Sequence, residues 1–162
     1  MAAASTVFTP VFDNNVETES ELISLPPGTP ARILSISPFP SDHAVLRKVI
    51  HGSPWELITR KTAADAVQEL YRTRFRVVFC EFHLTDGSWR DILEPAASLD
   101  EPPLLIVTSQ FADDHVWAEV LNLGGYDVLS KPLVAEEVRR VLHLAITHQM
   151  RPAHKQRAFY AG

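Results

Sequence analysis

Residues 77–80, Val-Val-Phe-Cys, form an unbroken apolar run, and an acidic residue, Glu81, follows directly. A strand that is covered on both faces of a parallel sheet has this composition, because neither of its faces meets water. The run therefore predicts a central parallel strand that ends next to Glu81. Cys80 is the single cysteine of the chain, so no internal disulfide is possible and we expect a buried thiol.

Shorter apolar runs lie on both sides of this strand and alternate with segments of helical periodicity. The five predicted strands are residues 33–36, 55–59, 77–80, 104–107 and 126–130. Strands that alternate with helices predict right-handed crossovers and a parallel sheet with helices on both faces. The expected fold class is therefore α/β, a flavodoxin-like, doubly wound (βα)5 sheet with strand order 2-1-3-4-5.

Local signals set the expected ends of the helices. Ser41, Thr62 and Ser88 each precede a helical segment and are expected to cap it. The pair Gly124-Gly125 is a typical helix stop. Residues 138, 141, 142 and 145 form the expected inner face of the last helix.

Charge divides the chain into three parts. The net charge is −5, which disfavours a general nucleic-acid-binding surface. Residues 1–30 hold four acids and no base and end in a proline-rich run, which predicts a disordered acidic leader and linker. The expected domain covers residues 31–147, and residues 148–162 form a basic tail with no output domain after it. The N-terminus lacks the pattern of a secretory signal and no window is apolar enough for a membrane span, so we expect a cytoplasmic protein.

Ligands of open parallel sheets bind at the carboxyl ends of the strands. In this chain those ends carry Ser37-Pro38, Glu81, Thr108-Ser109 and Lys131. Three of these residues also have a simpler interpretation: a solvated acid for Glu81, a surface lysine for Lys131 and a helix cap for Thr108.

Three stretches resemble the receiver domain of two-component response regulators. Residues 126–133 (Tyr-Asp-Val-Leu-Ser-Lys-Pro-Leu) are similar to the family's fifth strand and its Lys-Pro pair. Residues 81–88 lie where the family has its phosphoacceptor Asp and the loop after it, and Val107-Thr108 lies where it has a switch Thr or Ser. The resemblance runs from about Arg32 to Ala145. It implies that an acidic pair after the first strand and the acceptor Asp would hold Mg²⁺, while the Lys and Thr would bind the phosphoryl oxygens.

The sequence departs from this pattern in the pocket. The acidic-pair positions hold Ser37 and Pro38, and the acceptor position holds Glu81. Asp42 and His43 lie a turn further on and are expected to be poor replacements for the pair. Glu81 and Lys131 then sum to zero charge, so we expect a Glu81–Lys131 pair, no cofactor, and Mg²⁺ binding that is lost or weak.

A second departure concerns signalling. The resemblance implies an aromatic switch residue in the fifth strand, where this chain has Val128, and Tyr126 is expected on the same strand face. Trp117, Leu121 and Tyr126 are candidate contacts on a face formed by the fourth helix, fifth strand and fifth helix, a core position being the favoured alternative for each. For Trp89 we also expect a core position rather than a cover over the pocket.

These features predict a stand-alone, atypical receiver domain that is not an enzyme and acts by protein–protein interaction, with Glu81 imitating the phosphorylated state. The expected partner is a histidine kinase or an output protein, with a homodimer as a further possibility. One alternative is a receiver that is phosphorylated on a non-standard acceptor. The other is a small flavin- or nucleotide-binding protein, although residues 37–41 lack glycine and contain two prolines.

Overall fold

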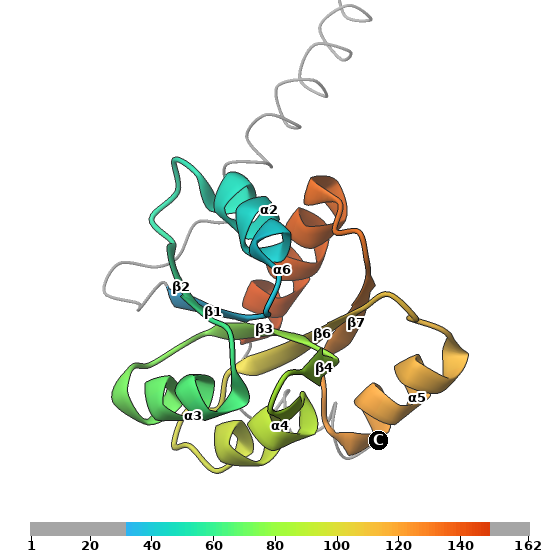
Figure 1. The fold of residues 1–162 in the computed structure, drawn as a ribbon. Coiled ribbons are helices and arrows are strands. Elements are labelled where there is room, and N and C mark those ends of the chain that lie inside the picture. Colours follow the sequence, from blue (N-terminus) through green and yellow to red (C-terminus); the bar gives the residue numbers. More distant parts are fainter. Residues whose placement is uncertain (1–31, 150–162) are drawn as a thin grey trace, which may run out of the picture.

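Five parallel strands form the sheet at the centre of the structure, a computed structural model that describes residues 32–149 (Figure 1). The strands are β1 (Arg32–Ile36), β2 (Glu56–Arg60), β3 (Val77–Glu81), β6 (Leu104–Ser109) and β7 (Asp127–Ser130). Their order is β2-β1-β3-β6-β7, which is 2-1-3-4-5 when only these five are counted. The predicted fold class and strand order are therefore confirmed. The predicted leader, and the tail beyond Gln149, lie outside the described residues.

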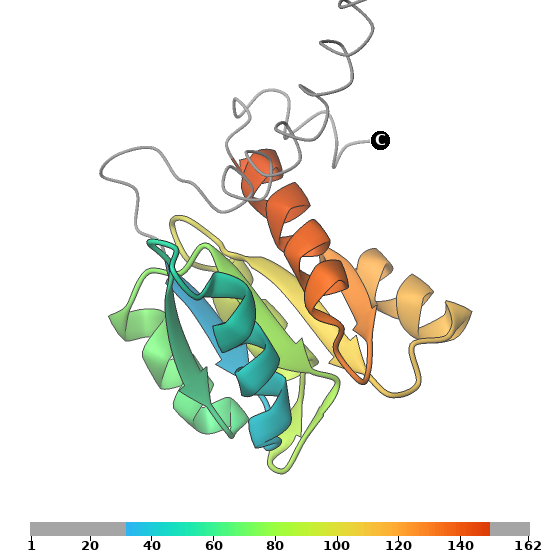
Figure 2. The ribbon, with the colours of Figure 1, turned by 90° about the horizontal axis from the view of Figure 1, so that it is seen from above.

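In the described part of the chain, five helices cover the sheet, two on one face and three on the other (Figures 1 and 2). The helices α2 (Pro40–Ile50) and α6 (Ala135–Gln149) lie side by side on one face. The opposite face carries α3 (Ala63–Arg72), α4 (Arg90–Ala97) and α5 (Asp114–Leu123). A small antiparallel pair, β4 (His83–Leu84) and β5 (Gly87–Ser88), lies in the connection between β3 and α4.

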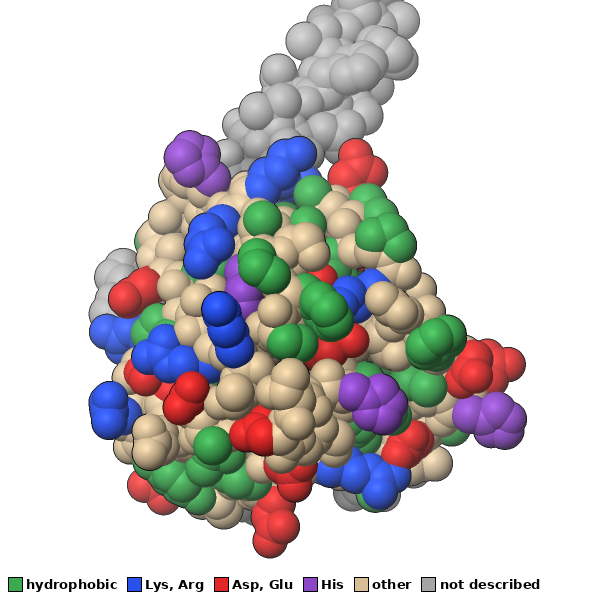
Figure 3. Space-filling view, in the orientation of Figure 1, with side chains coloured by type: hydrophobic (Ala, Val, Ile, Leu, Met, Phe, Trp, Pro, Cys, Tyr) green, Lys and Arg blue, Asp and Glu red, His purple; other side chains and the backbone are tan. Residues whose placement is uncertain are grey.

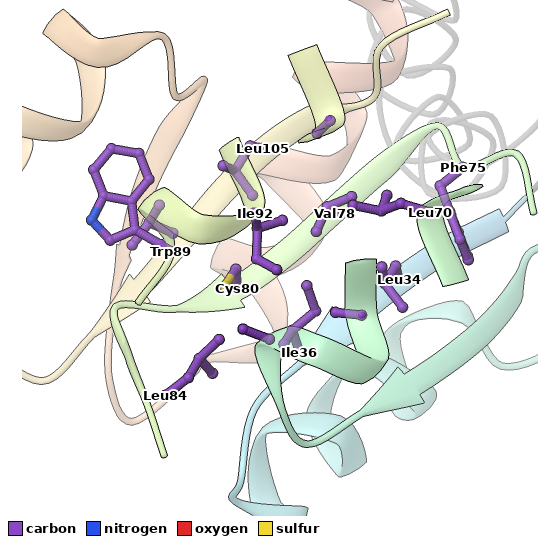
Figure 4. Packing of buried hydrophobic residues seen from close by; sticks show 14 of the residues in the cluster. Leu34, Ile36, Leu70, Phe75, Val78, Cys80, Leu84, Trp89, Ile92 and Leu105 are labelled. Atoms are coloured by element: carbon purple, nitrogen blue, oxygen red, sulfur yellow. The ribbon is translucent and has the colours of Figure 1, made fainter. Parts of the chain in front are cut away.

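The buried side chains of β3 divide between the two layers, as the alternation of a strand requires. Val77 and Phe79 pack with α2 and α6, whereas Val78 and Cys80 pack with the other three helices. Figure 4 shows this second cluster, with Trp89 at one end and Phe75 at the other. Trp89 and Cys80 are both fully buried, so their predicted core positions are confirmed.

Two of the predicted helix signals are confirmed, and two of the predicted caps are wrong. The side chain of Thr62 accepts a hydrogen bond from the amide of Asp65, and Gly124 ends α5 in the left-handed conformation. Ser41 is not a cap, because α2 already begins at Pro40, whose ring favours the first helical position. Ser88 lies one residue outside the cap of α4, although its amide still donates to Asp91.

The last helix extends further than expected. It ends at Gln149, so His148 belongs to α6, where it is buried, and not to the basic tail. Within residues 32–149, no helix combines the length and apolar character that crossing a membrane would require.

Candidate functional site

Four connections meet at the carboxyl end of the sheet and bring the polar residues of the candidate site together. Glu81 is the last residue of β3 and lies beside Thr108 of β6 in the parallel register. Lys131 directly follows β7, and its amide donates to the carbonyl of Ser109 at the end of β6. The register of the sheet therefore fixes where these three side chains enter the site.

The ammonium group of Lys131 is the centre of the site. Its Nζ lies 3.0 Å from Oε2 of Glu81 and 2.9 Å from Oδ2 of Asp42. The ring of Phe39 covers it, with the ring centroid 4.2 Å from Nζ, a distance suited to a cation–π contact. The three charged side chains are only 7–9% exposed, so neither the solvated-acid alternative for Glu81 nor the surface-lysine alternative for Lys131 is correct.

These contacts set the charge state of Lys131. Burial lowers the pKa of this lysine, but hydrogen bonds and charges from Asp42 and Glu81 outweigh burial and raise the pKa above the usual lysine value. The ammonium is therefore the stable form of Lys131 well beyond neutral pH.

Asp42 is the residue that the sequence prediction misjudged. It lies in the first turn of α2, and its Oδ2 accepts a hydrogen bond of 2.6 Å from Oγ of Ser37 as well as the bond from Lys131. The helix α2 begins at Pro40, two residues before the start that a Ser41 cap predicts, and its first turn carries this carboxylate into the pocket. Two carboxylates and one ammonium leave a formal charge of −1, so the predicted charge of zero is wrong.

Thr108 is directed at Glu81 and does not cap the next helix. Its Oγ1 donates a hydrogen bond of 2.9 Å to Oε2 of Glu81, the same oxygen that accepts from Lys131. The cap of α5 is instead Asp113. Thr108 and Lys131 thus hold the Glu81 carboxylate from two neighbouring strands.

A buried histidine supports the Asp42 side of the site. The ring of His43 contacts Oγ of Ser35 at 2.7 Å and the carbonyl oxygen of Ser37 at 3.0 Å. Since a carbonyl only accepts, Nε2 carries the proton and Nδ1 accepts from the Ser35 hydroxyl. Burial lowers the pKa of His43, so the neutral ring that this network needs is favoured at neutral pH. Pro38 is half-buried and provides no polar side-chain group.

Solved structures with the same architecture are receiver domains. A two-component response regulator from Clostridium difficile matches with a TM-score of 0.67 and 18% identity, covering 75% of this chain and 99% of its own. The signal receiver domain of an HD domain-containing protein from Pseudomonas fluorescens Pf-5 matches with a TM-score of 0.67 and 23% identity, covering 75% and 98%. A CheY-like response regulator receiver domain from Methanospirillum hungatei JF-1 gives 0.64 and 19%, covering 75% and 97%.

The chain has the receiver fold. The sequence itself matches no protein-family model and no curated protein, so the likeness is carried by the structure. The residues around Lys131 occupy the edge of the sheet at which the fold binds its ligands.

The carboxylates of this pocket that could serve the Mg²⁺ ion implied by the resemblance are those of Asp42 and Glu81. A magnesium site needs several hard oxygen ligands around the ion. Here Asp42 and Glu81 each direct an oxygen at the ammonium of Lys131, which lies between them. The residues that the structure describes contain no group of three or more His, Cys, Asp or Glu side chains able to hold a metal.

The predicted interaction face is only partly as expected. Trp117 and Leu121 are 42% and 41% exposed on α5, so the core alternative is wrong for both. Tyr126 is half-buried and packs against the α2–α6 cluster and the ring of His148, whereas Val128 packs in the opposite cluster. The two side chains do not share a face because Tyr126 precedes β7, where strand alternation does not hold.

Figure 3 shows one face of the receiver fold. Near its middle, acidic and basic side chains lie close together with hydrophobic side chains around them. This face of the molecule therefore carries exposed apolar side chains next to charged ones.

Removing the ammonium should leave two buried carboxylates without their shared partner. We expect Lys131→Met to lower the free energy of unfolding by about 3–5 kcal/mol, the range for breaking a buried ion pair from one side. Urea denaturation followed by circular dichroism measures this change. The exposed Lys48→Met is the matched control and should change stability by less than about 0.5 kcal/mol. Equal effects of the two substitutions would show that the pocket contacts of Lys131 contribute nothing.

The raised pKa of Lys131 also predicts a pH dependence. The unfolded chain releases this proton near pH 10.4 and the folded chain at a higher pH, so the stabilisation is complete below about pH 10.4 and is lost as pH rises through the folded pKa. The difference in unfolding free energy between the natural chain and Lys131→Met should therefore be constant from about pH 7 to 10 and narrow above it. Burial also raises the pKa of Cys80, but that thiol is common to both proteins and cancels in the difference. A difference that narrows below pH 9 would contradict the assignment.

Proposed function

We propose that this chain is an atypical receiver domain of two-component-type signalling that acts through protein–protein contacts without being phosphorylated. The observation that carries the proposal is the position of Lys131 between Asp42 and Glu81, with Thr108 bound to Glu81. The resemblance implies that Lys131 and Thr108 would bind a phosphoryl group, but in this chain both already bind carboxylates of the chain itself. No residue is assigned a catalytic role.

The electrostatics of the pocket oppose phosphorylation. Phosphoryl transfer depends on positive charge that neutralises the moving group, and in kinases and NTPases metal ions supply much of it. This pocket has one ammonium, which two carboxylates already share, and a formal charge of −1. A phosphoryl group would add a charge of nearly −2 at pH 7. Without a metal site, that charge would meet net repulsion.

The contacts of Glu81 favour a pocket in which Thr108 and Lys131 stay bound to its carboxylate. By the resemblance, Thr108 and Lys131 are the residues that would bind phosphoryl oxygens. In this chain both already bind one oxygen of the Glu81 carboxylate, at 2.9 and 3.0 Å. The carboxylate of Glu81 thus stands where the phosphoryl charge would be, with one charge instead of nearly two. We infer that the pocket holds Thr108 inward permanently.

The output of such a domain would be a contact surface. Trp117 and Leu121 are four residues apart on α5, so they lie on one face of the helix and are both exposed. Tryptophan is enriched in protein interfaces. A histidine kinase, an output protein or a second copy of the chain would use the surface of α5, β7 and α6.

Two other functions have weaker support. Asp42 favours a receiver with a non-standard acceptor, because it is a second carboxylate beside Lys131. A flavin- or nucleotide-binding protein would need free amides after β1, but the amides of Ser37 and Phe39 donate to the Arg60 carbonyl and to Oγ of Ser37. The contacts around Lys131 therefore favour an unphosphorylated receiver over both of these functions.

Intact mass spectrometry after incubation with acetyl phosphate and Mg²⁺ tests the proposal. The natural chain should gain no phosphoryl mass, because Glu81 stands at the acceptor position and Ser37 and Pro38 stand where the acidic pair would be. A variant carrying Ser37→Asp, Pro38→Asp and Glu81→Asp should gain one phosphoryl group. The single variant Glu81→Asp is the matched control for the acceptor alone and should stay unmodified, because the acidic pair is still absent.

A phosphoryl mass on the natural chain would overturn the proposal, and its loss in Asp42→Asn would identify the non-standard acceptor. A triple variant that folds but stays unmodified would remove the argument that the missing carboxylates are what silence the pocket.

A further inference from the structure

A groove runs beside the receiver pocket at the carboxyl end of the sheet. Its volume is about 540 Å³. The start of α2, the connection from β6 to α5 and the connection from β7 to α6 form its walls. The lining side chains that matter here are Phe39, Asp42, Val45, Phe111, Lys131 and Leu133.

The floor of this groove carries uncompensated negative charge. Asp42 lines the groove, and its two hydrogen bonds, from Ser37 and Lys131, both go to Oδ2. Among the described residues no side chain or amide donates to its Oδ1. Lys131 also lines the groove, but two carboxylates share its single positive charge. A ligand in the groove could therefore donate a hydrogen bond to Oδ1 of Asp42.

The elements that flank the groove add acids. Asp113 and Asp114 begin α5, two and three residues after Phe111, and Glu136 and Glu137 lie in the first turn of α6. A cationic ligand is favoured at such a surface over an anionic one.

The rim is apolar and exposed. Phe39 and Phe111, which line the groove, are 44% and 75% exposed. Aromatic rings beside a carboxylate suit arginine in particular, because its planar guanidinium stacks on aromatic faces and donates several hydrogen bonds at once.

We propose that this groove binds a segment of a partner protein that inserts an arginine with apolar neighbours. The guanidinium would donate to the free oxygen of Asp42 and lie against the rings of Phe39 and Phe111, while the neighbouring side chains cover the apolar rim. This proposal rests on the proposed function, because it describes one contact surface of a domain that acts by binding partners.

Amide NMR spectra of the full chain, titrated with short peptides, test the proposal. The probe is acetyl-Leu-Arg-Leu-amide, and acetyl-Leu-Gln-Leu-amide is its uncharged match. The arginine peptide should shift amides of the non-proline residues in the ranges 39–45, 110–112 and 131–133 with millimolar affinity, and added salt should weaken binding. The glutamine peptide should bind about tenfold more weakly, the effect of one charged hydrogen bond.

Three variants separate the groove from the rest of the surface. Asp42→Asn should weaken binding of the arginine peptide about tenfold. Phe111→Ala alters an exposed ring, so it should weaken binding without affecting folding. Asp65→Asn removes an exposed acid of α3, away from the groove, and should leave binding unchanged.

Three results would each overturn the proposal. The two peptides could bind equally well, or the shifts could persist unchanged in both Asp42→Asn and Phe111→Ala. The third is an absence of shifts at about 20 mM peptide, roughly the weakest affinity that one charged contact would give. The phosphorylation assay is independent of this titration. If the arginine peptide does not bind while the natural chain stays unphosphorylated, the proposed function is retained and only the proposal for the groove is rejected.

Discussion

The structure depends on how the buried ammonium of Lys131 is satisfied. A charge in this position must be paired, because desolvation without a partner is costly. Its pairing with Asp42 and Glu81 joins the connection after β7 to the end of β3 and to the start of α2. Phe39 then covers the ammonium from the solvent side. One cation therefore orders three segments that are far apart in the sequence.

The pairing continues through the sheet as a chain of hydrogen bonds. From Lys131 it passes through Glu81 to Thr108 on one side. On the other side it passes through Asp42 to Ser37, and His43 links Ser37 to Ser35 of β1. The register of the parallel strands sets the positions of Glu81, Thr108 and Lys131, whereas the start of α2 sets the position of Asp42. This arrangement explains how a receiver fold can fill its own pocket with its own side chains.

The fold was predictable because its signals are local. Apolar runs such as residues 77–80 mark the strands, and helix signals such as Thr62 and Gly124 mark ends that the structure confirms. The contact between Glu81 and Lys131 was also predictable, since both residues end parallel strands. The role of Asp42 was not, because it depends on the start of α2. Pro40 sets that start, whereas the predicted Ser41 cap put it two residues later in the chain.

The exposure of α5 was a second failure with a physical cause. Trp117 and Leu121 are large and apolar, and composition favours such residues in a core. Which side of a helix faces the sheet depends on tertiary packing, and here Val120 is the buried residue of α5. The sequence pattern alone could not separate a core residue from an apolar residue on a surface that binds a partner.

The central claim is that Glu81, Asp42 and Lys131 keep the pocket filled, so that it has no place for a phosphoryl group. Beryllofluoride imitates that group, and amide NMR spectra of the natural chain with and without beryllofluoride and Mg²⁺ test the claim directly. The account predicts that the amides of Glu81, Thr108 and Lys131 do not shift. Saturable shifts at these three residues would show that the pocket still accepts a phosphoryl group and would contradict the account.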